Sequence, residues 1–255
     1  MSVIAVYNAK GGVGQTTSCV NIAYEASRYG LKTLVWDLDA QGAASFYFGY
    51  DERHERTLEK TFHDDIERLI RRTAFPELDL IPSDMSYRNL DLFLDDCKKP
   101  KKQLARLLST VTHTYDVVLL DCPPNLSRLA DNIFHAVDCL LIPVIPSPLS
   151  LRTHEQVMAQ LPDNRKHSLD VWAFFSQVDM RKKIHVDTME SLQSDNAAIL
   201  TTPIPALSVI EAMGVYRAPV GSVAPHGRAA LAYRTLWYEL ADRLGICYQR
   251  NGEMP

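Results

Sequence analysis

A glycine-rich segment near the start of the chain, residues 9–17 (AKGGVGQTT), places strong limits on the fold. An apolar run typical of a β-strand, Ser2 to Tyr7, precedes it, and Thr16 to Tyr29 follows with apolar residues at helical spacing. In this context the glycines let backbone N–H groups close around phosphate oxygens, and the helix N-terminus adds partial positive charge. The segment therefore predicts a phosphate-binding loop, with the Thr16 hydroxyl placed to coordinate Mg²⁺.

The rest of the chain alternates between strand-like and helix-like segments. Apolar runs typical of buried parallel strands lie at residues 33–37, 78–82, 116–121, 139–144, 171–176 and 199–204. Helices are expected over 51–72, from 98, over 128–136, from 151, over 185–194 and over 227–244. This alternation predicts an α/β fold with a doubly wound, mostly parallel sheet flanked by helices. We expect residues 1–255 to form one domain.

Composition and charge narrow the classes of function. Hydrophobic residues make up 46% of the 255 residues and charged residues 23%, as in an ordinary globular protein. The net charge of −4 gives no overall attraction to nucleic acid, so any DNA contact must come from a local basic patch. Five cysteines without a CxxC pair argue against a disulfide framework or a zinc site. Without an export signal or a membrane-spanning run, we expect a cytoplasmic protein.

Carboxylates follow two of the predicted strands. Asp37 and Asp39 come directly after residues 33–36, and Asp121 ends the run VVLLD. The carboxyl ends of parallel strands share one edge of a sheet, where α/β proteins gather their ligands. Mg²⁺ prefers such hard oxygen ligands, although the two aspartates of the first pair could instead cap the next helix. Cys122, with no neighbouring His or Cys, is interpreted as a passive buried residue.

Several segments resemble the ParA/MinD family of P-loop ATPases. Lys10 to Thr17 (KGGVGQTT) is similar to its deviant Walker A motif, which is marked by an extra lysine early in the loop, here Lys10. Asp37 to Gly42 (DLDAQG) resembles the family's D-x-D-P-Q-G segment with Ala40 in place of proline, and residues 121–124 (DCPP) resemble its Walker B and second switch. Residues 140–151 and 204–212 also look like family segments. The resemblance runs over residues 2–245. Within the family, the chain is similar to the small form, which has no N-terminal helix-turn-helix.

The resemblance implies roles for individual residues. ATP and Mg²⁺ are the expected cofactors, and Lys10 is expected to reach across a nucleotide sandwich dimer to the partner's phosphates. Asp39 is expected to position the attacking water, while Thr16, Asp37 and Asp121 support the metal. The expected nucleotide contacts are Lys10, Gly11, Gly12, Val13, Gly14, Gln15, Thr16 and Thr17, with Ile204 and Pro205, and also Ser176 and Gln177, near the base.

Gln15 departs from the family pattern. The family has a second lysine there, which contacts the β- and γ-phosphates as a point charge. Glutamine offers two neutral N–H donors of similar reach but no positive charge. We therefore predict an ATPase whose hydrolysis is severely impaired. Whether Gln15 is natural or introduced stays open.

The implied function is an ATP-dependent dimerising switch that binds nucleoid DNA non-specifically and positions a cargo. A ParB-like or cargo-bound adaptor would stimulate hydrolysis, and no membrane association is expected because the end of the chain is nearly neutral and interrupted by glycine. The cargo stays open, as does the choice of DNA-contacting cations. The basic candidates are Lys98, Lys99, Lys101, Lys102, Arg106, Arg181, Lys182, Lys183, Arg217, Arg228 and Arg234. The alternatives are a non-catalytic nucleotide-binding scaffold and a metabolic enzyme such as an amide ligase.

Overall fold

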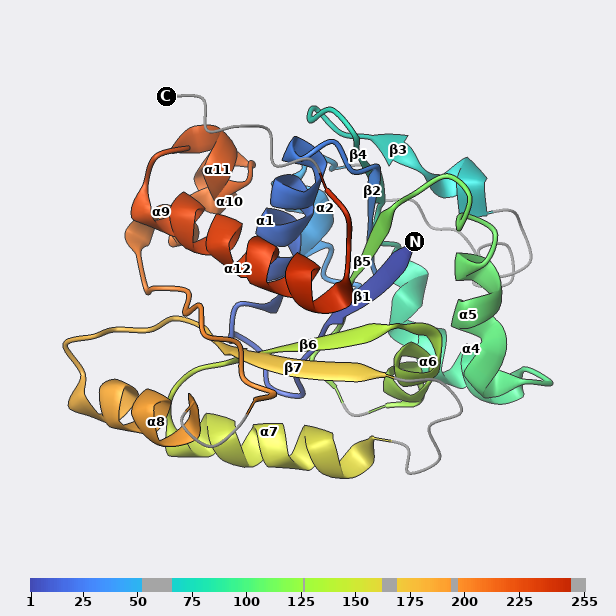
Figure 1. The fold of residues 1–255 in the computed structure, drawn as a ribbon. Helices are drawn as coiled ribbons and strands as arrows, with labels where there is room; N and C mark the ends of the chain where they lie inside the picture. Colours follow the sequence, from blue (N-terminus) through green and yellow to red (C-terminus); the bar gives the residue numbers. More distant parts are fainter. Residues whose placement is uncertain (52–65, 126, 162–168, 194–196, 249–255) are drawn as a thin grey trace.

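A parallel sheet forms the centre of the molecule (Figure 1). The computed structural model describes residues 1–51, 66–125, 127–161, 169–193 and 197–248. Within them, seven strands lie in the order β3-β4-β2-β5-β1-β6-β7, and all neighbours are parallel except β3 and β4. The prediction of a doubly wound, mostly parallel sheet is confirmed. The strands are β1 (Ser2–Val6), β2 (Thr33–Asp37), β3 (Arg71–Arg72), β4 (Leu78–Ile81), β5 (Val117–Asp121), β6 (Cys139–Val144) and β7 (Asp170–Phe175).

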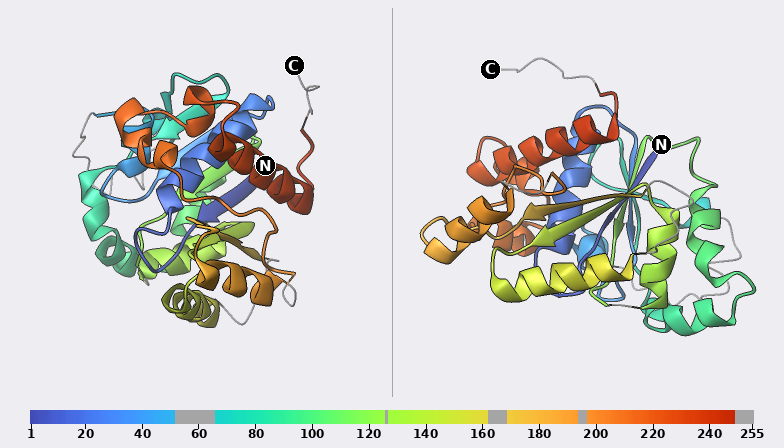
Figure 2. Two further views of the ribbon diagram at one scale, coloured as in Figure 1. Left: turned by 90° about the vertical axis from the view of Figure 1, so that its left-hand side faces the viewer. Right: turned by 60° about the horizontal axis from the view of Figure 1, so that its bottom comes forward.

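Helices cover both faces of the sheet, as the two views in Figure 2 show. On one face lie α1 (Gln15–Arg28) and α12 (Arg228–Leu244), together with the short helices α2 (Ala43–Tyr47), α9 (Ser208–Glu211), α10 (Met213–Tyr216) and α11 (Val220–Val223). On the other lie α4 (Leu90–Asp96), α5 (Gln103–Leu108), α6 (Arg128–Ala136), α7 (Pro148–Gln160) and α8 (Lys183–Gln193). The 3₁₀ helices are η1 (Ile66–Leu69), η2 (Met85–Asn89) and η3 (Pro100–Lys102).

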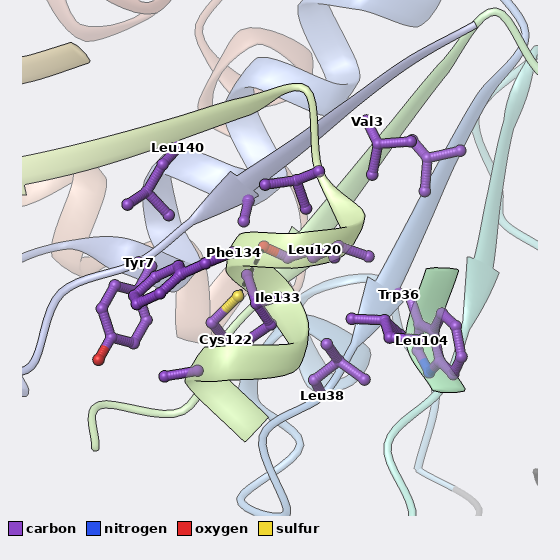
Figure 3. Packing of buried hydrophobic residues seen from close by; sticks show 14 of the residues in the cluster. Val3, Tyr7, Trp36, Leu38, Leu104, Leu120, Cys122, Ile133, Phe134 and Leu140 are labelled. Carbon is purple, nitrogen blue, oxygen red and sulfur yellow. Dashed lines mark hydrogen bonds between the residues drawn. The ribbon is translucent and has the colours of Figure 1, made fainter. Parts of the chain in front are cut away.

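Each central strand is buried on both sides, and its side chains alternate between two hydrophobic cores. In β5, Val118 and Leu120 pack into the core under α4 to α7, while Val117 and Leu119 pack under α1 and α12. Figure 3 shows Ile133 and Phe134 of α6 beside sheet residues of the first core. The Phe134 ring meets Tyr7 edge-on, with ring centroids 5.4 Å apart. This packing holds the carboxyl ends of the strands in a fixed arrangement.

Two predicted elements differ in the structure. Residues 199–204 form no strand: one isolated bridge joins Ile199 to Ala173 of β7, and a second joins the next residue, Pro205, to Val178 beyond the end of β7. Between the bridges, the backbone amides of Thr201 and Thr202 turn away and donate to the Glu239 carboxylate of α12, at 2.7 and 3.0 Å. Pro203 follows and has no N–H to give to a ladder. The turn toward α12 therefore interrupts the pairing.

The helix predicted over 51–72 lies partly outside the described residues, which leave out 52–65. Where the segment is described, η1 is followed by the short strand β3, which runs antiparallel along the edge of the sheet beside β4. The predicted helix included Arg71 and Arg72, which form this edge strand, so the prediction is wrong for these two residues. No helix among the described residues is long and apolar enough to cross a membrane.

Candidate functional site

The glycine-rich loop joins β1 to α1, as predicted. Gly14 stands at the N-cap of α1 in the left-handed region, with φ 89° and ψ 26°, and Gly12 has φ 76°. Asn8, directly before the loop, is fully buried: its Nδ2 donates to the Pro143 carbonyl at 2.7 Å, and its Oδ1 accepts from the Lys10 N–H at 3.0 Å. The start of the loop is thus fixed to the end of β6.

A pocket of about 420 Å³ opens beside this loop. It brings together the loop, the segment after β2, the end of β5 and the segment from Ile204 to Glu211, which are far apart in sequence. Its lining contains the predicted contacts Gly11, Gly12, Gly14, Gln15, Thr16, Thr17, Asp39, Ser176, Gln177, Ile204 and Pro205, and further Ala43, Tyr47, Cys122, Pro124, Ala206, Leu207, Ile210, Glu211 and Tyr233. A phosphate-binding loop at one end and an Ile-Pro wall at the other suit a nucleotide.

Two of the predicted contacts lie outside this lining. The Val13 side chain is fully buried, so only its backbone could meet a ligand. Lys10 points toward α7, where its Nζ donates to the Oγ of buried Ser150 at 3.3 Å. In the single chain Lys10 therefore lies beside the pocket, and its expected reach to a partner's phosphates stays a prediction.

Gln15 lies at the floor of the pocket and is 7% exposed. Its Nε2 donates to the backbone carbonyl of Asn8 at 3.2 Å and to that of Cys122 at 3.5 Å. These carbonyls follow β1 and β5, so the amide links the two central strands below the loop. The two N–H groups that could meet a phosphate are already used, and no positive charge stands at this position.

Asp37 and Asp121 are neighbours in register on β2 and β5, and both are fully buried. No hydrogen bond to either carboxylate oxygen of Asp121 has normal geometry among the described residues, and the Thr16 hydroxyl is a polar group that acts on it. Burial raises the pKa of Asp121 well above its usual range, the Asp37 carboxylate raises it further, and the Thr16 hydroxyl lowers it. A buried carboxylate without partners is costly unless a cation neutralises it. Asp121 and Thr16 therefore fit a hydrated Mg²⁺ at the end of the loop.

The Asp37 carboxylate, in contrast, accepts hydrogen bonds from Ser45. Burial raises its pKa to about 7, while the Ser45 hydroxyl and N–H, at 2.7 and 2.8 Å from Oδ2, lower it. Because Ser45 lies in the first turn of α2, the alternative that Asp37 caps the next helix is partly right. Among the described residues no three His, Cys, Asp or Glu side chains could hold a metal by themselves. A bound Mg²⁺ would draw its other ligands from water and phosphate, as this ion commonly does.

Sequence reasoning missed several residues that shape the site. Tyr47 and Tyr233 line the pocket from α2 and α12, far from any motif. Gln177, expected near the base, lines the pocket and also donates its Nε2 to the Gly12 carbonyl at 2.6 Å, a contact that was not predicted; it adopts φ 55°. Its turn after β7 therefore supports the loop directly. A role for Asn8 in holding the loop could have been predicted from the sequence, because Asn8 is a polar residue between the first strand and the glycines.

The buried carboxylate pair predicts how the stability of the nucleotide-free protein depends on pH. A folded-state pKa above the unfolded value of about 4 favours the fold while the group is protonated. That contribution is complete below about pH 4 and is lost as the pH rises through the folded pKa, about 7 for Asp37. Asp121→Asn removes one of these groups and should raise the free energy of unfolding at pH 8 by about 1–3 kcal/mol, with a smaller gain at pH 5.

Urea unfolding at the two pH values checks this prediction. The matched control is Asp116→Asn, an exposed carboxylate next to the other end of β5, which should change neither value by more than about 0.5 kcal/mol. If Asp121→Asn lowers the free energy of unfolding at pH 8, the charged carboxylate must be stabilised by an interaction that the structure does not show, which would contradict the prediction.

Comparisons with known proteins agree with this geometry. A family model described as an AAA domain matches residues 1–171. The sporulation initiation inhibitor protein Soj of Bacillus subtilis is 27% identical over 94% of this chain and 98% of its own length. The chain belongs to the ParA/MinD family of P-loop ATPases. The loop with Lys10 and the carboxylates at the ends of β2 and β5 are the segments on which the resemblance to this family rests, and Gln15 stands where that resemblance leads us to expect a lysine.

Solved structures show how widely this ParA/MinD fold occurs. The septum site-determining protein MinD of Pyrococcus horikoshii, complexed with Mg-ADP, superposes with a TM-score of 0.76 at 22% identity and covers 96% of this chain and 98% of its own. A cobyrinic acid a,c-diamide synthase of Mycobacterium smegmatis, with bound ADP and magnesium, reaches 0.81 at 23% identity and covers 96% of both chains. At these identities the likeness establishes the fold alone.

Proposed function

We propose that this chain is an ATP-dependent dimerising switch that binds DNA non-specifically and positions or segregates a cargo. The observation that carries the nucleotide part is the pocket beside the loop, which joins the phosphate-binding loop, Asp39 and a wall for the base. The buried Asp121 carboxylate lies directly before Cys122, which lines the pocket. The two solved structures with this fold were crystallised with ADP and magnesium. ATP with Mg²⁺ is the ligand that fits these features together.

Each part of the site has a distinct task in this proposal. Backbone N–H groups of the loop hold the phosphates, and the α1 N-terminus favours their charge. The Thr16 hydroxyl and, through water, Asp121 hold Mg²⁺, which neutralises charge on the phosphates. Asp39 lines the pocket and orients the attacking water, while Asp37 supports it from the buried side. Gln15 supplies no charge, so ATP is held longer than in a chain with lysine at this position.

Lys10 links nucleotide binding to dimerisation. Among the described residues its Nζ forms one hydrogen bond, to the Ser150 Oγ at 3.3 Å, which is long enough to exchange readily for a phosphate of a second protomer. Two chains facing each other across their loops would each supply this lysine to the partner's ATP. A cargo-bound adaptor acting on the dimer would then promote hydrolysis and release.

Intramolecular ion pairs reduce the list of cations available for DNA. Arg217 pairs with Asp51 at 2.6 Å, Arg234 with buried Glu25 at 3.4 Å, and Arg181 with Asp179 at 2.9 Å. Lys101 lies 3.7 Å from Asp131. Lys98, Lys99 and Lys102 near α5, Lys182 and Lys183 at α8, and Arg228 at the start of α12 form no ion pair within the described part of the chain. These six cations are the best candidates for phosphate contacts, and nucleoid association would follow from them.

DNA binding by the ATP form is tested with random-sequence duplex in about 50 mM salt, where phosphate contacts are strongest. We expect binding with Mg-ATP and much weaker binding with Mg-ADP. Lys182→Ala with Lys183→Ala, or Lys98→Ala, Lys99→Ala and Lys102→Ala together, should weaken binding equally for all sequences. Each phosphate that is no longer neutralised should flatten the salt dependence by about one unit of slope. If the ATP form does not bind even at low salt, DNA is not its partner.

A second candidate, a non-catalytic nucleotide-binding scaffold, is favoured by one observation. The Gln15 amide donates to two backbone carbonyls and so acts as a structural link below the loop. As a scaffold, the chain would bind ATP without any turnover cycle. Turnover by a Gln15→Lys variant separates the two candidates.

A further inference from the structure

Ser83 lies outside every recognised motif, two residues after the end of β4, yet hydrogen bonds link it to Asp39 directly and to Asp37 through Ser45. Its backbone N–H donates to the Ser45 Oγ at 2.9 Å, and the Ser45 hydroxyl in turn donates to the Asp37 Oδ2 at 2.7 Å. Its own hydroxyl donates to the backbone carbonyl of Asp39. One serine just beyond β4 thus holds Asp37 through Ser45 and Asp39 directly.

The loop that carries Asp39 is held from within by the Gln41 N–H, which donates to the Asp39 Oδ1 at 2.9 Å, but its outer side faces open space. A second pocket, of about 360 Å³, lies against the loop and is lined by Gln41, Gly42, Ala43, Phe46, Ser83 and Arg88, among others. A segment with open space on one side has few apolar contacts to fix its position, so its hydrogen bonds decide where it rests. The loop itself supplies a short turn, with Gly42 N–H donating to the Asp39 carbonyl at 2.9 Å.

Close packing explains why Ser83 can reach this carbonyl. Gly42 has φ 69°, and a Cβ added there would lie 3.5 Å from the Ser83 Cβ. The backbone of the turn therefore runs directly against Ser83. Ser45 is buried, so the part of the network that reaches Asp37 is shielded from competing water.

We propose that Ser83, acting with Ser45, is a positioning residue that sets where the Asp39 carboxylate stands in the nucleotide pocket. The inference rests on the proposed function, in which Asp39 orients the attacking water. Ser83 does not line the nucleotide pocket; it fixes the backbone that carries Asp39. Orientation of a reacting group matters steeply, because a displacement of about 1 Å can cost a hundredfold in rate.

The test combines turnover with a measurement that needs no turnover. In a Gln15→Lys background, Ser83→Ala should lower kcat about tenfold and leave KM for ATP within about twofold, because binding contacts stay while orientation is lost. Ser86→Ala is the matched control: the Ser86 hydroxyl lies three residues further on, is buried and has no hydrogen-bond partner among the described residues. It should change neither constant.

In the unaltered chain, the rate of amide hydrogen exchange measures directly how firmly the Asp39 loop is held. Ser83→Ala should speed exchange at residues 41–45 about fivefold, the equivalent of one missing hydrogen bond, and Ser86→Ala should not. Unchanged exchange, or a rise in KM without a fall in kcat, overturns the positioning role. If Gln15→Lys shows no turnover while exchange responds as expected, the proposed function fails and the contact between Ser83 and the loop stands.

Discussion

The Gln15→Lys variant should hydrolyse ATP at least about a hundredfold faster than the unaltered chain. Removing one preorganised electrostatic donor from an active site typically lowers kcat by about 10²–10³-fold, and an ammonium adds charge as well as a donor. The fold is ready to accept it. The Asn8 and Cys122 carbonyls that now receive the Gln15 amide could hold the lysine Nζ until phosphate arrives.

Phosphate release at saturating Mg-ATP, with DNA present, measures this effect. Gln15→Met, which matches the length of the side chain without donors or charge, is the control and should stay as slow as the unaltered chain. Adding Asp39→Ala to Gln15→Lys should remove the gain, since the attacking water then has no acceptor. A Gln15→Lys chain that binds ATP but does not turn it over would favour the scaffold.

Gly14→Ala should weaken nucleotide binding at least about a hundredfold. An L-residue at this left-handed position is strained by about 1–2 kcal/mol, and the new Cβ would lie 2.8 Å from the Ser176 Oγ. The Ser176 N–H is bonded to the Val144 carbonyl at 2.9 Å, which holds its backbone, and the residue is buried, so its Oγ has little free space into which to rotate. The loop would have to shift, and its backbone N–H groups would no longer all point toward the phosphate oxygens.

Gly30→Ala is the matched control for this variant. Gly30 has φ 78°, close to that of Gly14, but nothing lies within 4 Å of a Cβ added there. It should reduce the free energy of unfolding by about 1 kcal/mol and leave nucleotide affinity unchanged. Titration with a fluorescent ATP analogue, alongside thermal unfolding of both variants, separates the two effects. Equal affinity losses in both variants would mean that backbone strain alone explains the Gly14 result.

The sequence predicted most of the sheet because its central strands are short apolar runs followed by turns, and parallel strands buried on both faces leave that pattern. It also predicted that the loop, Asp37, Asp39 and Asp121 lie at the carboxyl ends of strands, since Asp37 and Asp121 end apolar runs and the loop and Asp39 come shortly after such runs. The pairing of Ser83 with the Asp39 carbonyl left no such signal. It depends on β4 lying next to β2 in the sheet, which the order of strands along the chain does not reveal.

The directions in which side chains point could not be predicted from the sequence either. The loop pattern gives Lys10 and Gln15 neighbouring places, but packing sends one toward Ser150 and the other toward two carbonyls under the loop. The strand expected at 199–204 failed for a related reason. Glu239 lies about 40 residues later in the chain and draws two amides out of the ladder, an interaction that no local pattern encodes.

Light scattering of the unaltered chain tests the central claim, that ATP drives dimerisation through this site, most directly. The mass is measured without nucleotide, with Mg-ADP and with Mg-ATP, and Lys10→Ala with Mg-ATP serves as the control. We predict one chain of 28.8 kDa in the first two conditions, twice that mass with Mg-ATP, and a monomer for Lys10→Ala even when ATP is bound. A monomer in all conditions despite bound ATP, or a dimer that forms equally without nucleotide, would contradict the account.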